Sequence, residues 1–185
     1  MRRTVELGFL LALALLLSYV ETLIPFTFGI PGIKLGLPNL IVLLLLYEEV
    51  GNADFEDTGG AGKKGKGKAT REALLVNGLR IVLSGFLFSN LYAILYALAG
   101  AALSFLAMTA GKKWGRFSMI GVSVLGGVFH NIGQILVAMA VVETFAVAYY
   151  MPFLLVAGTV MGAVLGVAGM EISPYLRRFW QEGQR

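Results

Sequence analysis

Three polar side chains interrupt the long apolar stretch between Met119 and Val142: His130, Asn131 and Gln134. Hydrocarbon cannot hydrogen-bond a side chain, so polar groups at that depth need protein or water partners, and they are candidates for function. On a helix His130 and Gln134 lie one turn apart on one face, with Asn131 beside them. These residues can either bind a polar ligand or hold neighbouring helices together. The sequence leaves both interpretations open.

Arg80 carries a permanent positive charge near the middle of another apolar stretch. An arginine at that depth costs about 2.5–3.5 kcal/mol on insertion scales unless it faces a partner or water. Asn77 and Ser84 share its helix face by i−3 and i+4 spacing. Arg80 and His130 are each roughly nine residues from the same membrane surface, which predicts a similar depth. The alternative is an internal ion pair between Arg80 and Glu21, because buried charges usually pair.

These groups together predict a polar pocket that opens on the outer side of the membrane and is cationic at its base. A carboxylate, phosphate or diphosphate would complement that charge. An aromatic lining would suit a ligand with an apolar body, and Phe26, Phe28, Tyr92, Tyr149 and Tyr150 are the expected residues. The predicted substrate-binding residues are Lys34, Asn39, Arg80, His130, Asn131 and Gln134.

The composition predicts that these residues are held by membrane helices. The chain has 185 residues, of which 57% are hydrophobic and 14% charged, with a mean hydropathy of +0.78. Soluble domains carry about 25% charged residues, so we expect one integral, all-α membrane domain over residues 1–185. The absence of cysteine excludes disulfides and thiolate metal sites, and we expect no metal or cofactor. The net charge of +4 does not indicate nucleic acid, because the basic residues fall between apolar segments and at the termini.

The apolar segments predict a bundle of six transmembrane helices. The second is short for the roughly 20 residues that a straight crossing needs. Basic residues cluster before the first span, between the second and third, between the fourth and fifth, and after the last, so the positive-inside rule places both termini in the cytoplasm. Residues 51–70 then form a flexible, cytoplasmic loop rich in glycine and lysine. The expected spans are Val5–Ile24, Leu35–Tyr47, Glu72–Phe88, Leu91–Ala110, Met119–Val142 and Val147–Met170.

Two patterns in the sequence suggest a catalytic motif, but each lacks residues that the motif requires. Residues 62–69 approach a phosphate-binding P-loop, but Ala69 replaces the magnesium-binding hydroxyl and no strand precedes the motif. Asp54 and Asp57 do not make the paired aspartate-rich motifs of a magnesium-dependent prenyl synthase. We therefore expect a binding or transport subunit and not an enzyme.

Small residues at four-residue spacing predict close packing of helices in lipid. Gly158, Gly162 and Gly166 form one such strip, which we assign to internal packing. Gly8 and Ala12 form a similar strip, which can face either the bundle or a partner subunit.

Four stretches of the sequence resemble the Gx transporter family, which is also catalogued as heptaprenyl diphosphate synthase component I. They are residues 31–39 (PGIKLGLPN), Leu79-Arg80, residues 121–126 (GVSVLG) and residues 130–134 (HNIGQ). That family is in turn similar to the S components of energy-coupling-factor transporters, six-helix membrane proteins that capture a small molecule outside the cell. The resemblance implies the same fold, with a first-helix strip, here Gly8 and Ala12, that contacts a transmembrane coupling subunit joined to ATPases.

Three functions follow from these observations. The first is a substrate-binding subunit of a transporter, which takes a small anionic or amphipathic molecule from the outer side of the cell membrane. The second is a non-catalytic membrane component that associates with a soluble heptaprenyl diphosphate synthase subunit in isoprenoid metabolism. The third is a structural membrane protein without a ligand.

Overall fold

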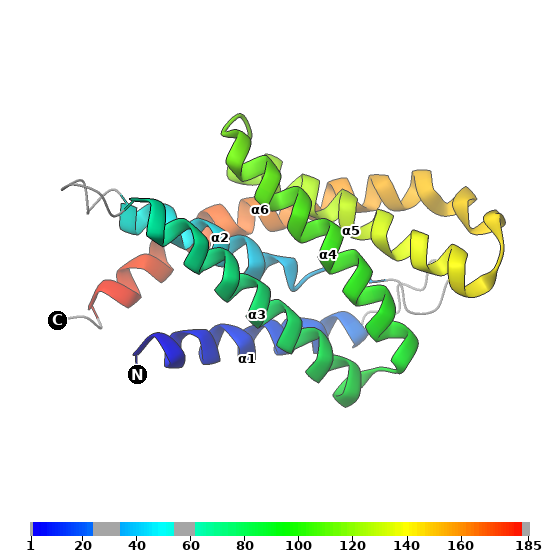
Figure 1. Cartoon of the computed structure of the whole chain (residues 1–185), viewed down its shortest axis with the longest axis horizontal. Helices are drawn as coiled ribbons and strands as arrows, with labels where there is room; N and C mark the ends of the chain where they lie inside the picture. Colours follow the sequence, from blue (N-terminus) through cyan, green and yellow to red (C-terminus); the bar gives the residue numbers. More distant parts are fainter. Residues whose placement is uncertain (1, 24–33, 54–61, 183–185) are drawn as a thin grey trace.

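The computed structural model describes residues 2–23, 34–53 and 62–182, and this part of the chain is helical without any strand. The helices lie along one long axis, and α1 begins at the same end of the molecule at which α6 finishes (Figure 1). The predicted all-α class is therefore confirmed. The elements are α1 (Arg2–Leu23), α2 (Asn39–Ala53), α3 (Gly62–Phe88), α4 (Leu91–Trp114), α5 (Met119–Val142), the 3-10 helix η1 (Phe145–Tyr150) and α6 (Met151–Glu182).

Four of the described segments are long and apolar enough to cross a membrane. They are Arg3–Leu23, Leu91–Trp114, Met119–Val142 and Phe145–Leu176, so the last span is longer than the predicted one and includes η1. The two other predicted spans fall on α2 and α3 and do not meet the same criterion. Helix α2 has only 15 residues, and even the apolar half of α3, residues 71–88, carries three charged side chains, those of Arg71, Glu72 and Arg80. The membrane class is thus supported by four helices, and a six-span bundle remains a proposal.

Helix α3 begins earlier than the sequence analysis predicted. Residues 62–70 were expected in a flexible loop, but they form the first turns of α3. Lysine and alanine favour a helix once the packed apolar half has nucleated it, and this propensity outweighs the glycines between them. Residues 51–53 likewise extend α2, and residues 54–61 of the expected loop lie outside the described residues.

Glycines of α6 allow its backbone to approach that of α5. A Cβ atom at Gly158 would lie 2.7 Å from the carbonyl oxygen of Gly127, and one at Gly162 would lie 2.6 Å from the Cα atom of Val124. Gly166 is similarly close to Ile120. These distances are too short for any side chain, so the predicted packing role of the α6 strip is confirmed.

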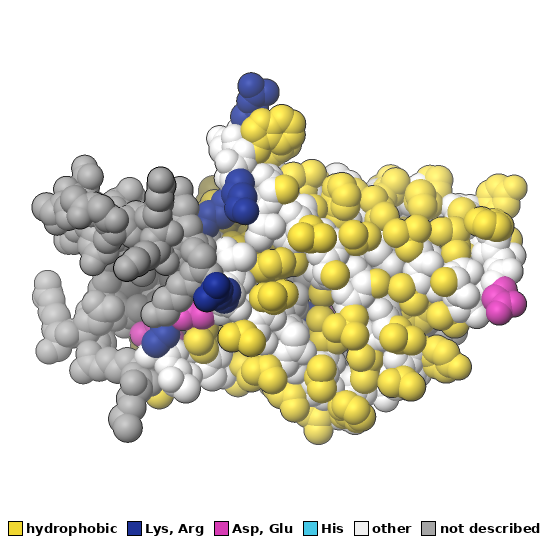
Figure 2. All heavy atoms as spheres, viewed as in Figure 1, with side chains coloured by type: hydrophobic (Ala, Val, Ile, Leu, Met, Phe, Trp, Pro, Cys, Tyr) yellow, Lys and Arg dark blue, Asp and Glu magenta, His cyan; other side chains and the backbone are white. Residues whose placement is uncertain are grey.

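The molecule presents an apolar exterior and keeps several polar side chains inside. Large hydrophobic side chains cover the face seen in Figure 2, and dark blue basic side chains lie along one boundary of that surface. Water would penalise such an exterior, whereas lipid does not. On α1, Gly8 and Ala12 are exposed, and a Cβ at Gly8 would meet no atom within 4 Å. This strip therefore faces outward and not into the described bundle.

Candidate functional site

Arg80 lies in the interior of the bundle, as its helix face predicted. It is only 5% exposed, and its neighbours on α3, Asn77 and Ser84, are buried with it. The guanidinium donates through Nη2 to Asn77 Oδ1 at 2.7 Å and through Nη1 to Ser18 Oγ on α1 at 3.4 Å. Two neutral oxygens thus solvate part of the charge. Its Nε has no hydrogen-bond partner among the described residues.

Glu21 does not form the direct ion pair with Arg80 that the sequence allowed. Its Oε1 accepts hydrogen bonds from the backbone N–H of Gly36 and, at 3.2 Å, from that of Leu37. No ion pair within 4.0 Å joins Glu21 to Arg80, although their opposite charges attract one another across the interior. The carboxylate instead clamps the segment Lys34–Pro38, which precedes α2, onto the end of α1.

The clamped segment turns sharply into α2. Gly36 has a φ of +83°, a conformation that glycine adopts without the strain a side chain would cause. The Asn39 N–H then bonds the Gly36 carbonyl at 2.9 Å and the Ile41 N–H bonds the Pro38 carbonyl at 3.0 Å, which starts the helix. This turn places the Asn39 side chain beside Gly36: a Cβ atom at Gly36 would lie 2.9 Å from Asn39 Nδ2.

Lys34 connects this segment to α5. Its backbone N–H donates to Gln134 Oε1 at 3.3 Å, and its Nζ reaches Ser89 Oγ at 3.4 Å at the end of α3. Lys34 belongs to no helix. Burial lowers the pKa of its ammonium group, with Arg80 acting in the same direction and the Glu21 carboxylate opposing them. The positive charge of Lys34 therefore lies close to the positive charge of Arg80 and to the negative charge of Glu21.

His130 and Gln134 form the predicted pair on α5. Gln134 Nε2 lies 3.1 Å from His130 Nε2. Since Gln134 Oε1 already accepts from Lys34, its amide nitrogen faces the imidazole and donates to it, which assigns the proton of neutral His130 to Nδ1. The ring fits between two glycines: a Cβ at Gly36 would lie 3.1 Å from its Cδ2 atom, and one at Gly100 would lie 2.9 Å from its Nδ1 atom.

Asn131 faces away from this group. Its Nδ2 donates to the Leu154 carbonyl at 2.5 Å and lies beside Gly158, so its side chain points toward α6. Five of the six predicted substrate-binding residues therefore form one group of neighbours, linked by hydrogen bonds, by contacts around Gly36 or by electrostatic interaction with Arg80. We call them the polar cluster: Lys34, Asn39, Arg80, His130 and Gln134.

Buried polar atoms without a partner occur within the polar cluster. Among the described residues, Asn39 Nδ2, Arg80 Nε and His130 Nδ1 are buried and make no hydrogen bond of normal geometry, although His130 Nδ1 faces the backbone of Gly100. All three are nitrogens that carry hydrogen in the assigned state. Native interiors rarely leave such donors unpaired, so each one requires an explanation. Asn131 Oδ1, on the α6 side, is the fourth unpaired atom.

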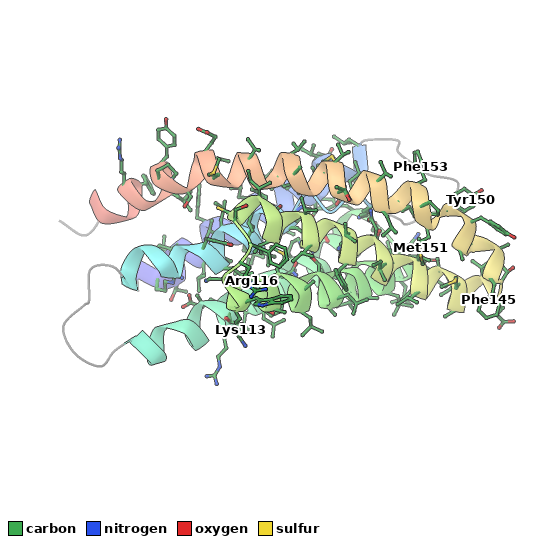
Figure 3. All side chains as sticks on the ribbon, turned by 90° about the horizontal axis from the view of Figure 1, so that it is seen from above. Lys113, Arg116, Phe145, Tyr150, Met151 and Phe153 are labelled. Atoms are coloured by element: carbon green, nitrogen blue, oxygen red, sulfur yellow. The ribbon has the colours of Figure 1, made fainter. Side chains whose placement is uncertain are left out.

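The expected aromatic lining was wrong for the residues that the structure describes. Tyr92 and Tyr149 are exposed in the first turn of α4 and in η1, and Tyr150 is exposed at the end of η1. Figure 3 shows Tyr150 with Phe145 at the far end of the α5–α6 pair. Aromatic side chains favour the boundary between lipid and water, which accounts for this position. Phe26 and Phe28 lie outside the described residues.

Several residues that contribute to the polar cluster were not predicted from the sequence. Ser18 lies three residues before Glu21 on α1, so helical spacing could have identified both as one polar face. No sequence pattern around three other residues indicates a role in the cluster, because their contacts are with elements that are distant in sequence. These residues are Ser89, Gly36 and Gly100. Within the described residues, no three His, Cys, Asp or Glu side chains are grouped so that they could hold a metal ion.

A comparison with protein families assigns the chain to one family. The family model described as heptaprenyl diphosphate synthase component I matches residues 10–53 and 68–172, which include every residue of the polar cluster. Comparisons with curated proteins and with solved structures gave no match. Since the match covers most of the sequence, this chain belongs to the heptaprenyl diphosphate synthase component I family.

Proposed function

We propose that this chain is a substrate-binding membrane subunit of a transporter, which captures a small anionic or amphipathic molecule at the polar cluster. The observation that carries the proposal is the presence of unpaired, buried donors in the polar cluster, above all those of Asn39 and Arg80. A ligand rich in acceptor oxygens would offer these donors the partners that the described residues do not supply. A cluster that served only to join helices would be expected to pair its own donors and acceptors.

The charge of the cluster favours an anion. Arg80 and Lys34 contribute two positive charges and Glu21 one negative charge, which its backbone hydrogen bonds already engage. The remaining donors suit a carboxylate, a phosphate or a diphosphate, whose oxygens accept several hydrogen bonds at once. Arg80 suits this role because its guanidinium presents a planar fork of donors.

The resemblance to S components supports the same role. We propose that α2 and α3 complete six crossings of the cell membrane, with both termini in the cytoplasm and the cluster reached from outside. In this arrangement the outward strip with Gly8 and Ala12 contacts a coupling subunit, and separate ATPases hydrolyse the nucleotide. The chain itself performs no catalysis.

A substitution series at Arg80 tests the site. The probes are inorganic diphosphate and farnesyl diphosphate, and binding is measured with purified protein in nanodiscs. We expect Arg80→Lys to weaken binding about tenfold, because a lysine cannot reproduce the fork, and Arg80→Ala to weaken it further. Arg71→Ala, which removes an exposed arginine from the same helix, is the matched control and should bind like the parent. Equal binding by all variants would contradict the proposed site.

The family match favours a second candidate, a membrane component that associates with a heptaprenyl diphosphate synthase. The family name itself describes one component of such an enzyme. A cationic cluster in an apolar protein would then hold the diphosphate of a prenyl chain. Co-purification separates the candidates: ATPase subunits favour the transporter, and a soluble prenyl synthase favours the second role. If neither partner nor ligand is recovered, a structural membrane protein becomes the better interpretation.

A further inference from the structure

The turn between α4 and α5 places basic and aromatic side chains together on the exterior. We call residues Lys113–Phe117 the basic–aromatic turn. Trp114 is 66% exposed and Phe117 39% exposed, and Lys113 and Arg116 beside them are exposed as well. Lys113 and Arg116 lie near one another at this turn in Figure 3, and in Figure 2 the turn projects from the upper edge, where basic side chains lie beside hydrophobic ones.

The turn is an ordered structure. Gly115 ends α4 with a φ of +70°, and its N–H bonds the Lys112 carbonyl at 3.2 Å. The Ser118 side chain then caps α5 by accepting from the Gly121 N–H at 3.2 Å. The Arg116 guanidinium carbon lies 5.8 Å from the centre of the Trp114 ring, and the Phe117 ring meets Trp114 edge-on at 6.1 Å. The Trp114 ring thus contacts the arginine on one side and Phe117 on another.

The charge around the turn has one sign. The whole stretch from Leu91 to Val142 contains no aspartate or glutamate, and its only charged residues are Lys112, Lys113 and Arg116. Lys112 is engaged within the bundle, because its Nζ donates to the Leu46 carbonyl and lies 5.4 Å from the centre of the Tyr47 ring. Lys113 and Arg116, by contrast, are exposed and form no ion pair with the residues that the structure describes.

We propose that the basic–aromatic turn binds the headgroup of an anionic phospholipid. Lys113 and Arg116 pair with the headgroup phosphate, and Trp114 and Phe117 insert at the boundary of the hydrocarbon. Three features favour lipid over a protein partner: the turn joins two membrane-spanning helices, exposed leucine such as Leu106 flanks it on α4, and tryptophan prefers this depth. The site is separate from the polar cluster and does not depend on its function.

Trp114 provides a direct test. Trp180 is the chain's other tryptophan, so Trp180→Phe in the full chain leaves Trp114 as the single reporter. The protein is placed in phosphatidylcholine nanodiscs that contain a small, equal fraction of brominated phosphatidylglycerol or brominated phosphatidylcholine, and quenching of Trp114 is measured. We expect stronger quenching by the anionic lipid. In the double variant Lys113→Gln, Arg116→Gln, that preference should fall by about fivefold for each charge removed.

Arg71→Gln, at an exposed basic residue of α3, is the matched control and should leave the preference unchanged. Equal quenching by the two lipids would overturn the proposal, because the turn would then lie in the membrane without selecting charge. Quenching by neither lipid would also overturn it and would place the turn in water, as expected for a surface that docks a soluble protein. A double variant that kept the full preference would show that other residues bind the headgroup.

Discussion

At the scale of single residues, the bundle stabilises its buried charges mainly through neutral groups and backbone. Arg80 donates to a serine and an asparagine, and Glu21 accepts from two backbone N–H groups. This arrangement leaves the arginine's charge uncompensated by direct contact, which is the condition for binding an anion. A contact ion pair would have consumed the same donors.

Glu21 should matter chiefly as a hydrogen-bond acceptor. Glu21→Gln keeps a carbonyl oxygen for Gly36 and Leu37, whereas Glu21→Ala leaves two N–H groups without their partner. Each unpaired buried group costs about 1–3 kcal/mol, so the alanine variant should melt at a clearly lower temperature than the glutamine variant. Thermal unfolding in nanodiscs measures this, with exposed Glu143→Ala as the control. Equal loss in both Glu21 variants would show that the carboxylate charge, and not the clamp, stabilises the fold.

Asn131 should stabilise the bundle without contributing to ligand affinity. Its side chain bonds the Leu154 carbonyl on α6, away from the polar cluster. Asn131→Ala should therefore lower stability by about 1–3 kcal/mol and leave diphosphate binding at the parent's affinity. Gln134→Ala is the comparison, because it removes a cluster member and should weaken binding. A loss of affinity in Asn131→Ala equal to that in Gln134→Ala would place Asn131 in the site after all.

At the scale of helices, glycine decides which faces meet. Gly158→Val would push a side chain against the carbonyl oxygen of Gly127, a backbone atom that cannot move without separating α5 from α6. Overpacking of this kind costs about 1–3 kcal/mol or more, so a markedly lower melting temperature is expected. Gly8→Val is the matched control, since a Cβ at Gly8 meets nothing within 4 Å. If Gly158→Val unfolded no earlier than Gly8→Val, the close α5–α6 contact would be wrong.

At the scale of the whole molecule, basic residues mark one boundary of the apolar surface and the aromatic residues of η1 lie at the other end (Figures 2 and 3). This asymmetry predicts that the basic boundary faces the cytoplasm. The natural chain has no cysteine, so Arg71→Cys and Glu143→Cys each introduce a single thiol. A membrane-impermeant reagent added to intact cells should label Glu143→Cys and spare Arg71→Cys. The reverse pattern would invert the orientation.

Features that depend on local spacing and composition could be predicted from the sequence. It predicted the helical class, the buried face of Asn77, Arg80 and Ser84, the His130–Gln134 pair and the α6 glycine strip. Each of these follows from the 3.6-residue period or from the cost of polar groups in lipid, and both act within one helix.

Which elements contact one another became known from the tertiary structure. It turned Glu21 to the backbone of residues 36 and 37, joined Lys34 to Gln134 across 100 positions, directed Asn131 to α6 and left Tyr92 and Tyr149 exposed. Helical period fixes the residues that share a face, but it does not fix the neighbour toward which that face rotates. That choice depends on the packing of several helices at once, because one close contact such as Gly127 with Gly158 sets the rotation of both partners.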